Sequence, residues 1–82
     1  MNKHILLVMR WLKDKDSVSQ EELEKNRREA YAATDANLVG AWAAAYAAAS
    51  AYHVGNDANY WVNRYFEETG EDKNKYLKEL EK

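Results

Sequence analysis

The chain has 82 residues, and its 12 basic and 14 acidic side chains give a net charge of −2 at neutral pH. This length allows one small domain, which we expect to span residues 1–82. Because the charges nearly balance, no overall field attracts nucleic acid, and we do not expect a nucleic-acid partner. The absence of cysteine excludes disulfides, thiolate nucleophiles and cysteine-based metal sites, and it favours a cytoplasmic protein.

The sequence predicts no segment that enters a membrane. The first nine residues combine a positive charge with an apolar run, but Arg10 and Lys13 interrupt the pattern and no small-residue cleavage site follows. The uncharged stretch 36–56 is long enough to cross a bilayer, yet it consists mainly of weakly apolar alanine and includes polar residues such as Ser50 and His53. We therefore expect no membrane partner.

The periodicity of apolar residues predicts an all-α fold, a compact bundle of four to five helices. The chain has no proline and only three glycines, so few residues interrupt helical segments. We expect the first helix over about residues 3–14, with Ile5, Val8, Met9 and Leu12 on its buried face.

The clearest local signal precedes the second helix. Ser19 is expected to be its N-cap, and Glu22 three residues later completes a capping box. Val18 is placed to pack against Leu23, which would fix the angle at which the chain enters the helix.

The end of this second helix is left open by the sequence. It either continues through the following alanine-rich segment to Val54 or breaks near residues 34–36. Thr34 and Asp35 could cap a new helix there, and Gly40 weakens the region.

An uncharged helix at the centre of the chain is the main feature of the sequence. Eight of the eleven residues from Ala41 to Ala51 are alanine, the best helix former. A surface helix normally presents polar groups to water, so this one must be covered. Either it is the centre of the bundle or, as we expect, another copy or a partner covers it. This argument predicts a homo-oligomer.

Two further helices are expected after this segment. Gly55 is predicted to end the alanine-rich helix, and Asp57 to cap a helix that reaches about Glu68. Gly70 should end that helix, and Asp72 should cap the last one. The expected inward-facing residues are Ala58, Trp61, Val62, Tyr65 and Phe66 in the first of these helices, and Tyr76, Leu77 and Leu80 in the second.

Aromatic residues give the main candidate for a binding surface. Three Trp, six Tyr and one Phe make up 12% of the chain, either as core rings that fill the space beside small alanines or as exposed anchors. Val39, Tyr46 and His53 repeat every seven residues, the spacing of a helix–helix seam. The candidate interface comprises Leu38, Trp42, Ala45, Tyr46, Ala49, Tyr52 and His53.

We find no catalytic residues in the sequence. Neither histidine, His4 or His53, lies in a Ser-His-Asp, zinc-protease or phosphate-loop context. His53 and Asp57 are four residues apart, but Gly55 between them favours a helix terminus and a cap. The acidic residues around Glu71 are expected in caps and on solvated faces. The chain is therefore predicted not to be an enzyme and to need no cofactor or metal.

Several segments resemble a group of small uncharacterised proteins of tailed bacteriophages. The likeness lies in the start, Met1 to Leu12, in a centre rich in Ala, Tyr and Asp, and in the run Trp61 to Lys73. No activity of this group carries over to individual residues. The resemblance implies a small accessory protein that acts in the bacterial cytoplasm, where many such proteins bind and block a host factor or a defence system, as anti-CRISPR proteins do.

Three functions follow from these observations. The leading hypothesis is a protein–protein interaction module that self-associates and inhibits a host or defence protein. The second is a nucleotide-binding oligomer that stacks a base on Trp or Tyr and holds the phosphate with Arg27, Arg28 or Arg64. The third is a structural or assembly role in the virion.

Overall fold

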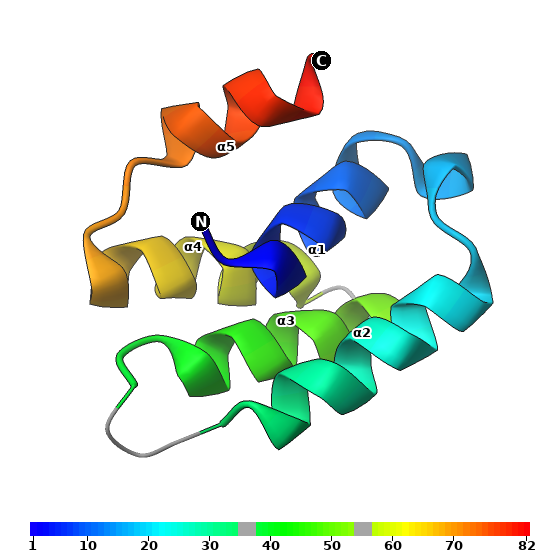
Figure 1. Ribbon diagram of the computed structural model, residues 1–82, viewed down its shortest axis with the longest axis horizontal. Helices are drawn as coiled ribbons and strands as arrows, with labels where there is room; N and C mark the ends of the chain where they lie inside the picture. Colours follow the sequence, from blue (N-terminus) through cyan, green and yellow to red (C-terminus); the bar gives the residue numbers. More distant parts are fainter. Residues whose placement is uncertain (35–37, 54–56) are drawn as a thin grey trace.

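The computed structural model describes residues 1–34, 38–53 and 57–82, and within these ranges it is helical, without strands. The α-helices are α1 (Lys3–Lys13), α2 (Gln20–Ala32), α3 (Ala41–Tyr52), α4 (Ala58–Thr69) and α5 (Lys73–Leu80), and a 3₁₀ turn, η1 (Lys15–Ser17), follows α1 (Figure 1). The predicted all-α bundle is thus confirmed.

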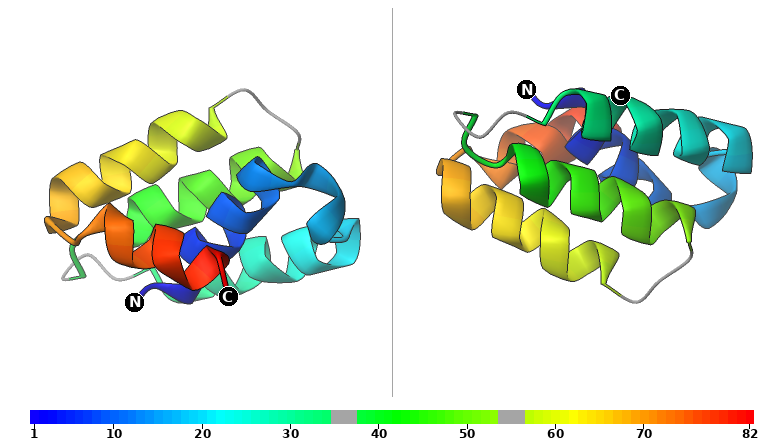
Figure 2. Two further views of the ribbon diagram at one scale, coloured as in Figure 1. Left: turned by 90° about the horizontal axis from the view of Figure 1, so that it is seen from above. Right: turned by 90° about the horizontal axis from the view of Figure 1, so that it is seen from below.

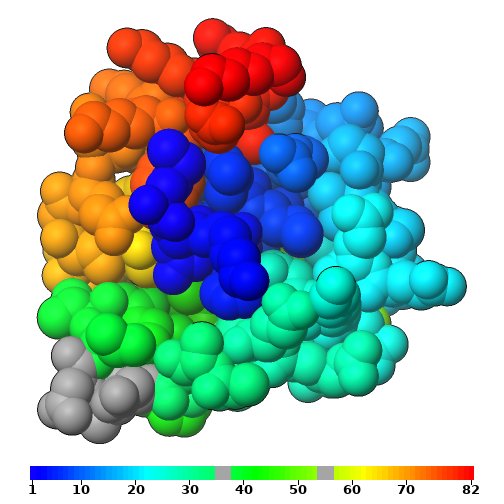
Figure 3. All heavy atoms as spheres, in the orientation of Figure 1, coloured from blue at the N-terminus to red at the C-terminus, as the bar shows by residue number. Residues whose placement is uncertain are grey.

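The helices form two layers. Helices α2, α3 and α4 lie side by side in one layer, with α3 in the middle (Figure 2). Helices α1 and α5 form the second layer, on one face of the first. Helix α1 packs across α3 and α4 and buries Ile5, Val8 and Met9, as its periodicity predicts. The space-filling view shows the first residues in the middle of one face, between the C-terminal segment and α2 (Figure 3).

Helix α3 is the centre of the bundle. Its buried residues are all alanine: Ala43, Ala44, Ala45, Ala47, Ala48 and Ala51. Small side chains let α1, α2 and α4 approach α3 closely from three sides. Of the two alternatives for this alanine face, the structure shows the centre of the bundle, because an amphipathic α1 and two flanking helices cover it within one chain.

The helix ends explain where the elements begin and stop. Ser19 and Glu22 form the predicted capping box at the start of α2. Gly70 ends α4 with a positive φ of 71°, and the Asp72 side chain accepts a hydrogen bond from the backbone N–H of Asn74 at the start of α5. Asp57 occupies the N-cap position of α4 but makes no side-chain capping bond, so this part of the prediction was wrong. Gly55 and Val54 lie outside the described residues.

The chain breaks between α2 and α3, which settles the alternative that the sequence left open. Thr34 does not cap a new helix: its hydroxyl donates to the carbonyl of Tyr31 at 2.6 Å and so closes α2. Asp35 lies outside the described residues. Helix α3 begins instead after Gly40, which has a φ of 83°.

Candidate interaction surface

Five aromatic rings from three helices touch one another in a continuous row, which we call the aromatic strip: Tyr31 of α2, Trp42 and Tyr46 of α3, and Tyr60 and Trp61 of α4. Centroid distances are 6.4 Å from Tyr31 to Trp42 and 5.9 Å from Trp42 to Tyr46. Across the next boundary they are 4.7 Å from Tyr46 to Trp61 and 4.9 Å from Trp61 to Tyr60. The strip therefore crosses the whole α2–α3–α4 layer.

Much of the aromatic strip faces solvent. Trp42 is 48% exposed, Tyr46 38% and Tyr60 57%, whereas Tyr31 and Trp61 are half-buried between them. Edge-to-face and tilted contacts of this kind are each worth about 0.5–1.5 kcal/mol. The rings thus hold one another in place before any partner arrives, which lowers the entropic cost of binding.

The exposed side of α3 continues the strip along the helix axis. Trp42, Tyr46, Ala49 and His53 follow at spacings of four, three and four residues, and all of them are exposed or half-exposed. Leu38, just before the helix, is 57% exposed. Four of the seven predicted interface residues therefore share one surface, whereas Leu38 lines a groove with Asn2 and His4 instead.

Two further predicted interface residues also lie away from this surface. Ala45 is fully buried in the core, because one residue's rotation away from Tyr46 carries it off the exposed side of α3. Tyr52 is half-buried, and its ring stacks under the Arg27 guanidinium at 5.3 Å. Its backbone carbonyl accepts a hydrogen bond from Gln20 Nε2 at 2.9 Å, so Tyr52 joins α3 to α2.

Arginine residues border the aromatic strip on two sides. Arg28 lies three residues before Tyr31, so both occupy one face of α2. Arg64 lies three residues after Trp61, and its Nε donates to Glu68 at 3.0 Å. Arg27 instead packs against Tyr52, as described above. Two of the three arginines named in the nucleotide hypothesis thus flank the rings.

A second cluster of polar side chains, which the sequence did not reveal, surrounds Glu71. Its carboxylate accepts hydrogen bonds from the hydroxyls of Tyr65, at 2.7 Å, and Tyr76. The Tyr76 hydroxyl in turn accepts the backbone N–H of Asn2 at 2.7 Å. Glu71 is exposed, as the sequence predicted, but its hydrogen bonds to two tyrosines were not predicted. Its role depends on α1, α4 and α5 meeting, which no local sequence signal indicates.

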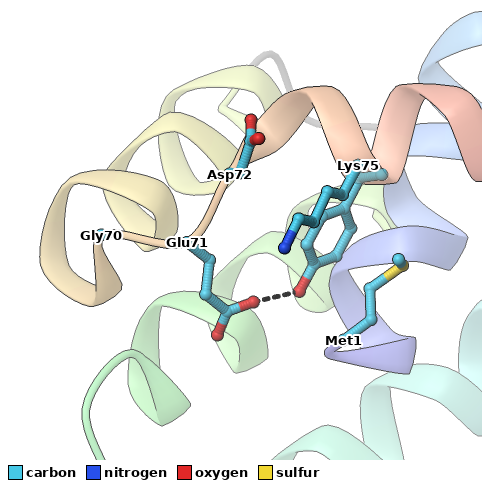
Figure 4. A pocket seen from close by; sticks show the side chains of 6 residues that line it. Met1, Gly70, Glu71, Asp72 and Lys75 are labelled. Carbon is cyan, nitrogen blue, oxygen red and sulfur yellow. Dashed lines mark hydrogen bonds between the residues drawn. The ribbon is translucent and has the colours of Figure 1, made fainter.

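This cluster borders an open pocket of about 460 Å³ between the chain start and the α4–α5 connection. Figure 4 shows the Glu71 carboxylate at the Tyr76 hydroxyl, with Met1 and Lys75 nearby. The hydrogen bond from Tyr76 is the main cause that lowers the pKa of Glu71, and burial is the main cause that raises the pKa values of Tyr65 and Tyr76. These shifts match a structural role, in which a charged carboxylate accepts from two neutral phenols.

The buried histidine also has a structural partner. His4 Nδ1 lies 2.8 Å from Asn26 Oδ1, and Asn26 Nδ2 donates to the His4 carbonyl at 3.2 Å. This pair joins α1 to α2. Among the residues with described positions, no three His, Asp or Glu side chains gather in a way that could hold a metal ion.

The comparisons with known proteins give no family for this chain. No protein-family model, no curated protein and no solved structure matches it. None of the helices in the described ranges combines the length and the apolar character that a membrane crossing requires.

Proposed function

We propose that this chain is a small protein–protein interaction module that binds its partner through the aromatic strip. The observation that carries this proposal is the exposure of Trp42, Tyr46 and Tyr60 within a row of rings that is already ordered. Tyr and Trp dominate the binding energy of protein interfaces, because they bury a large area with few rotatable bonds. An isolated exposed ring would need no explanation, but a connected row across three helices does.

The resemblance to small bacteriophage proteins supplies the setting for this proposal. In that setting the partner is a bacterial host protein or a component of a defence system, and binding blocks its function. A rigid helical layer suits such a role, since it presents the anchors without folding on binding.

Affinity capture from a bacterial host lysate tests this function. We expect wild type to retain a host protein in a defined stoichiometry, and Tyr60→Ala to weaken that binding roughly tenfold or more. Leu77→Ala is the matched control, since Leu77 is a comparably exposed apolar residue on α5, away from the strip. Equal retention by wild type and Tyr60→Ala would contradict the proposal.

A nucleotide-binding function is the second candidate, and the position of Arg28 and Arg64 beside the rings favours it. A base could stack on Trp42 or Tyr46 while a guanidinium holds the phosphate. Quenching of Trp fluorescence by nucleoside triphosphates, lost in Arg28→Gln, would support it. The adjacent Glu68, which already pairs with Arg64, opposes an anionic ligand.

A further inference from the structure

We propose that in the free protein the aromatic strip is covered by a second copy of the chain, with the two α3 helices antiparallel across a twofold axis midway between Tyr46 and Ala49. This inference rests on the proposed function, because it names the partner that the strip meets first. It keeps the seam through Tyr46 and His53 that the sequence predicted, and it leaves out Ala45, which is buried in the core.

The spacing of the exposed residues on α3 fits a helix–helix seam. Trp42, Tyr46, Ala49 and His53 alternate steps of four and three, as the a and d positions of a coiled coil do. Helix α3 carries no charged side chain between its first and last residue. Two copies can therefore approach along this seam without like-charge repulsion.

The sizes of the seam residues select the antiparallel orientation. The first half of α3 presents the large rings of Trp42 and Tyr46, whereas the second half presents Ala49 and then His53 just after the helix. In a parallel pair, Trp42 and Tyr46 would each face the same residue of the second copy, and the two small Ala49 residues would leave a gap between the helices. In an antiparallel pair, Tyr46 packs on Ala49 of the second copy, a large side chain into a small one.

A single twofold axis satisfies both pairs of contacts. Tyr46 and Ala49 have the same midpoint along the chain as Trp42 and His53. The axis that brings Tyr46 of one copy to Ala49 of the other therefore also brings Trp42 to His53. A twofold interface uses one surface on both copies, so every contact occurs twice. The antiparallel arrangement also opposes the dipoles of the two α3 helices.

The size of the exposed strip predicts a reversible dimer. Taking about 200 Å² for one aromatic side chain, the three exposed rings offer roughly 300 Å². A standard interface buries about 800 Å² on each partner, so the polar edges of α2 and α4 must supply the remainder. We therefore expect dissociation in the micromolar range. Because the same rings serve both contacts, a bound target would exclude the second copy.

A size swap across the axis tests the orientation by sedimentation velocity. Tyr46→Ala and Ala49→Tyr should each weaken the dimer roughly tenfold, the first by removing a ring and the second by opposing two rings. The double variant restores a large residue against a small one, and we expect its dimer to regain most of the lost affinity. Leu77→Tyr, at an exposed residue of α5 in the other layer, is the control.

A spin label provides a readout that does not depend on the swapped residues. The chain has no cysteine, so Asp57→Cys gives a single attachment site, and Asp57 makes no capping bond that its loss would break. Labelled protein is mixed with ¹⁵N-labelled wild type. In an antiparallel dimer the indole signal of Trp42 should broaden most, that of Trp61 less, and that of Trp11, on α1, least.

These measurements distinguish failure of this inference from failure of the proposed function. Stronger broadening of Trp61 than of Trp42, a double variant no better than the weaker single variant, or a monomer at every concentration would overturn the antiparallel dimer. If host-protein capture still depends on Tyr60 in that case, the proposed function stands. If capture is also independent of Tyr60, both are wrong.

Discussion

Gly40 is a single residue on which the contact between two helices depends. Its φ of 83° is one that residues with a Cβ rarely adopt. An added Cβ would lie 2.6 Å from Thr69 Cγ2 and 2.9 Å from the Tyr65 ring. The glycine therefore both starts α3 and lets the end of α4 pack against that start.

Replacing Gly40 by Ala should cost about 1–3 kcal/mol of stability, because backbone strain and a steric clash act together. Gly70→Ala is the matched control: its φ is also positive, 71°, but nothing lies within 4 Å of the added Cβ. Urea unfolding of both variants measures the difference. Equal losses would show that the close approach of α4 to Gly40 contributes nothing.

Glu71 should make the free energy of unfolding decrease as the pH falls into the acid range. Its pKa lies below the ordinary value of 4.5, mainly because Tyr76 donates to the charged carboxylate. The corresponding stabilisation is present above that ordinary value and is lost as pH falls through the lowered pKa. We expect Glu71→Gln to be less stable than wild type at neutral pH, with the difference shrinking below about pH 4. A constant difference across the acid range would contradict this assignment.

Tyr65 and Tyr76 should make the free energy of unfolding decrease as the pH rises into the basic range. Burial is the first cause that raises the pKa values of Tyr65 and Tyr76 above 10.0. The unfolded chain ionises first, so the stabilisation is full below about pH 10 and declines above it. Tyr76→Phe should flatten this decline when unfolding free energies are measured from about pH 9 to about pH 12. Spectrophotometric titration would show directly whether both phenols ionise late.

At the scale of elements, helix boundaries could be predicted wherever a side chain bonds to its own backbone. The Ser19 capping box, Gly70 and Asp72 depend on residues within four positions, so the pattern contains the whole interaction. The start of α3 could not be predicted in this way. It depends on the contact of Gly40 with Thr69, which is distant in sequence.

Ser19→Ala should lose about 1 kcal/mol, because the start of α2 would lack its cap. Ser19→Asp keeps an acceptor for the backbone N–H of Glu22 and is the control that should restore most of this loss. Chemical denaturation compares the three proteins. A midpoint that does not change in Ser19→Ala would mean that the capping box contributes no stability.

The central position of α3 predicts how alanine positions respond to charge. Ala48→Glu would bury an unpaired carboxylate among three helices and should unfold the chain. Ala49 is the next residue and is half-exposed, so Ala49→Glu should leave the fold intact. Circular dichroism of both variants tests this contrast. A folded Ala48→Glu protein would show that α3 can turn that side outward.

At the scale of the whole molecule, the aromatic strip could be predicted only in part. Periodicity placed Trp42 and Tyr46 on one stripe of a helix, which is local geometry. Tyr31, Tyr60 and Trp61 were not among the predicted interface residues, because their contact with that stripe depends on how α2 and α4 flank α3. Ala45 was placed on the wrong side, since an uncharged helix gives little signal about which side faces inward.

The outer position of α5 predicts an order of local opening. Its main helix contact in the described structure is with α1, whereas α3 is flanked by three helices. Hydrogen exchange should therefore be fastest in α5 and slowest in the buried part of α3. Equal protection of α4 and α5 would show that the Tyr76 contacts couple α5 to global unfolding.

The hydrogen bond from Asn2 to Tyr76 has a consequence for folding during synthesis. The two residues are 74 positions apart, so the acceptor is made long after the donor has left the ribosome. The segments that form α1, α2 and α3 are made before α4 and α5, and the polar cluster around Glu71 needs residues of both later helices. The native set of hydrogen bonds is therefore complete only after α5 has been made and brings Tyr76 to Asn2.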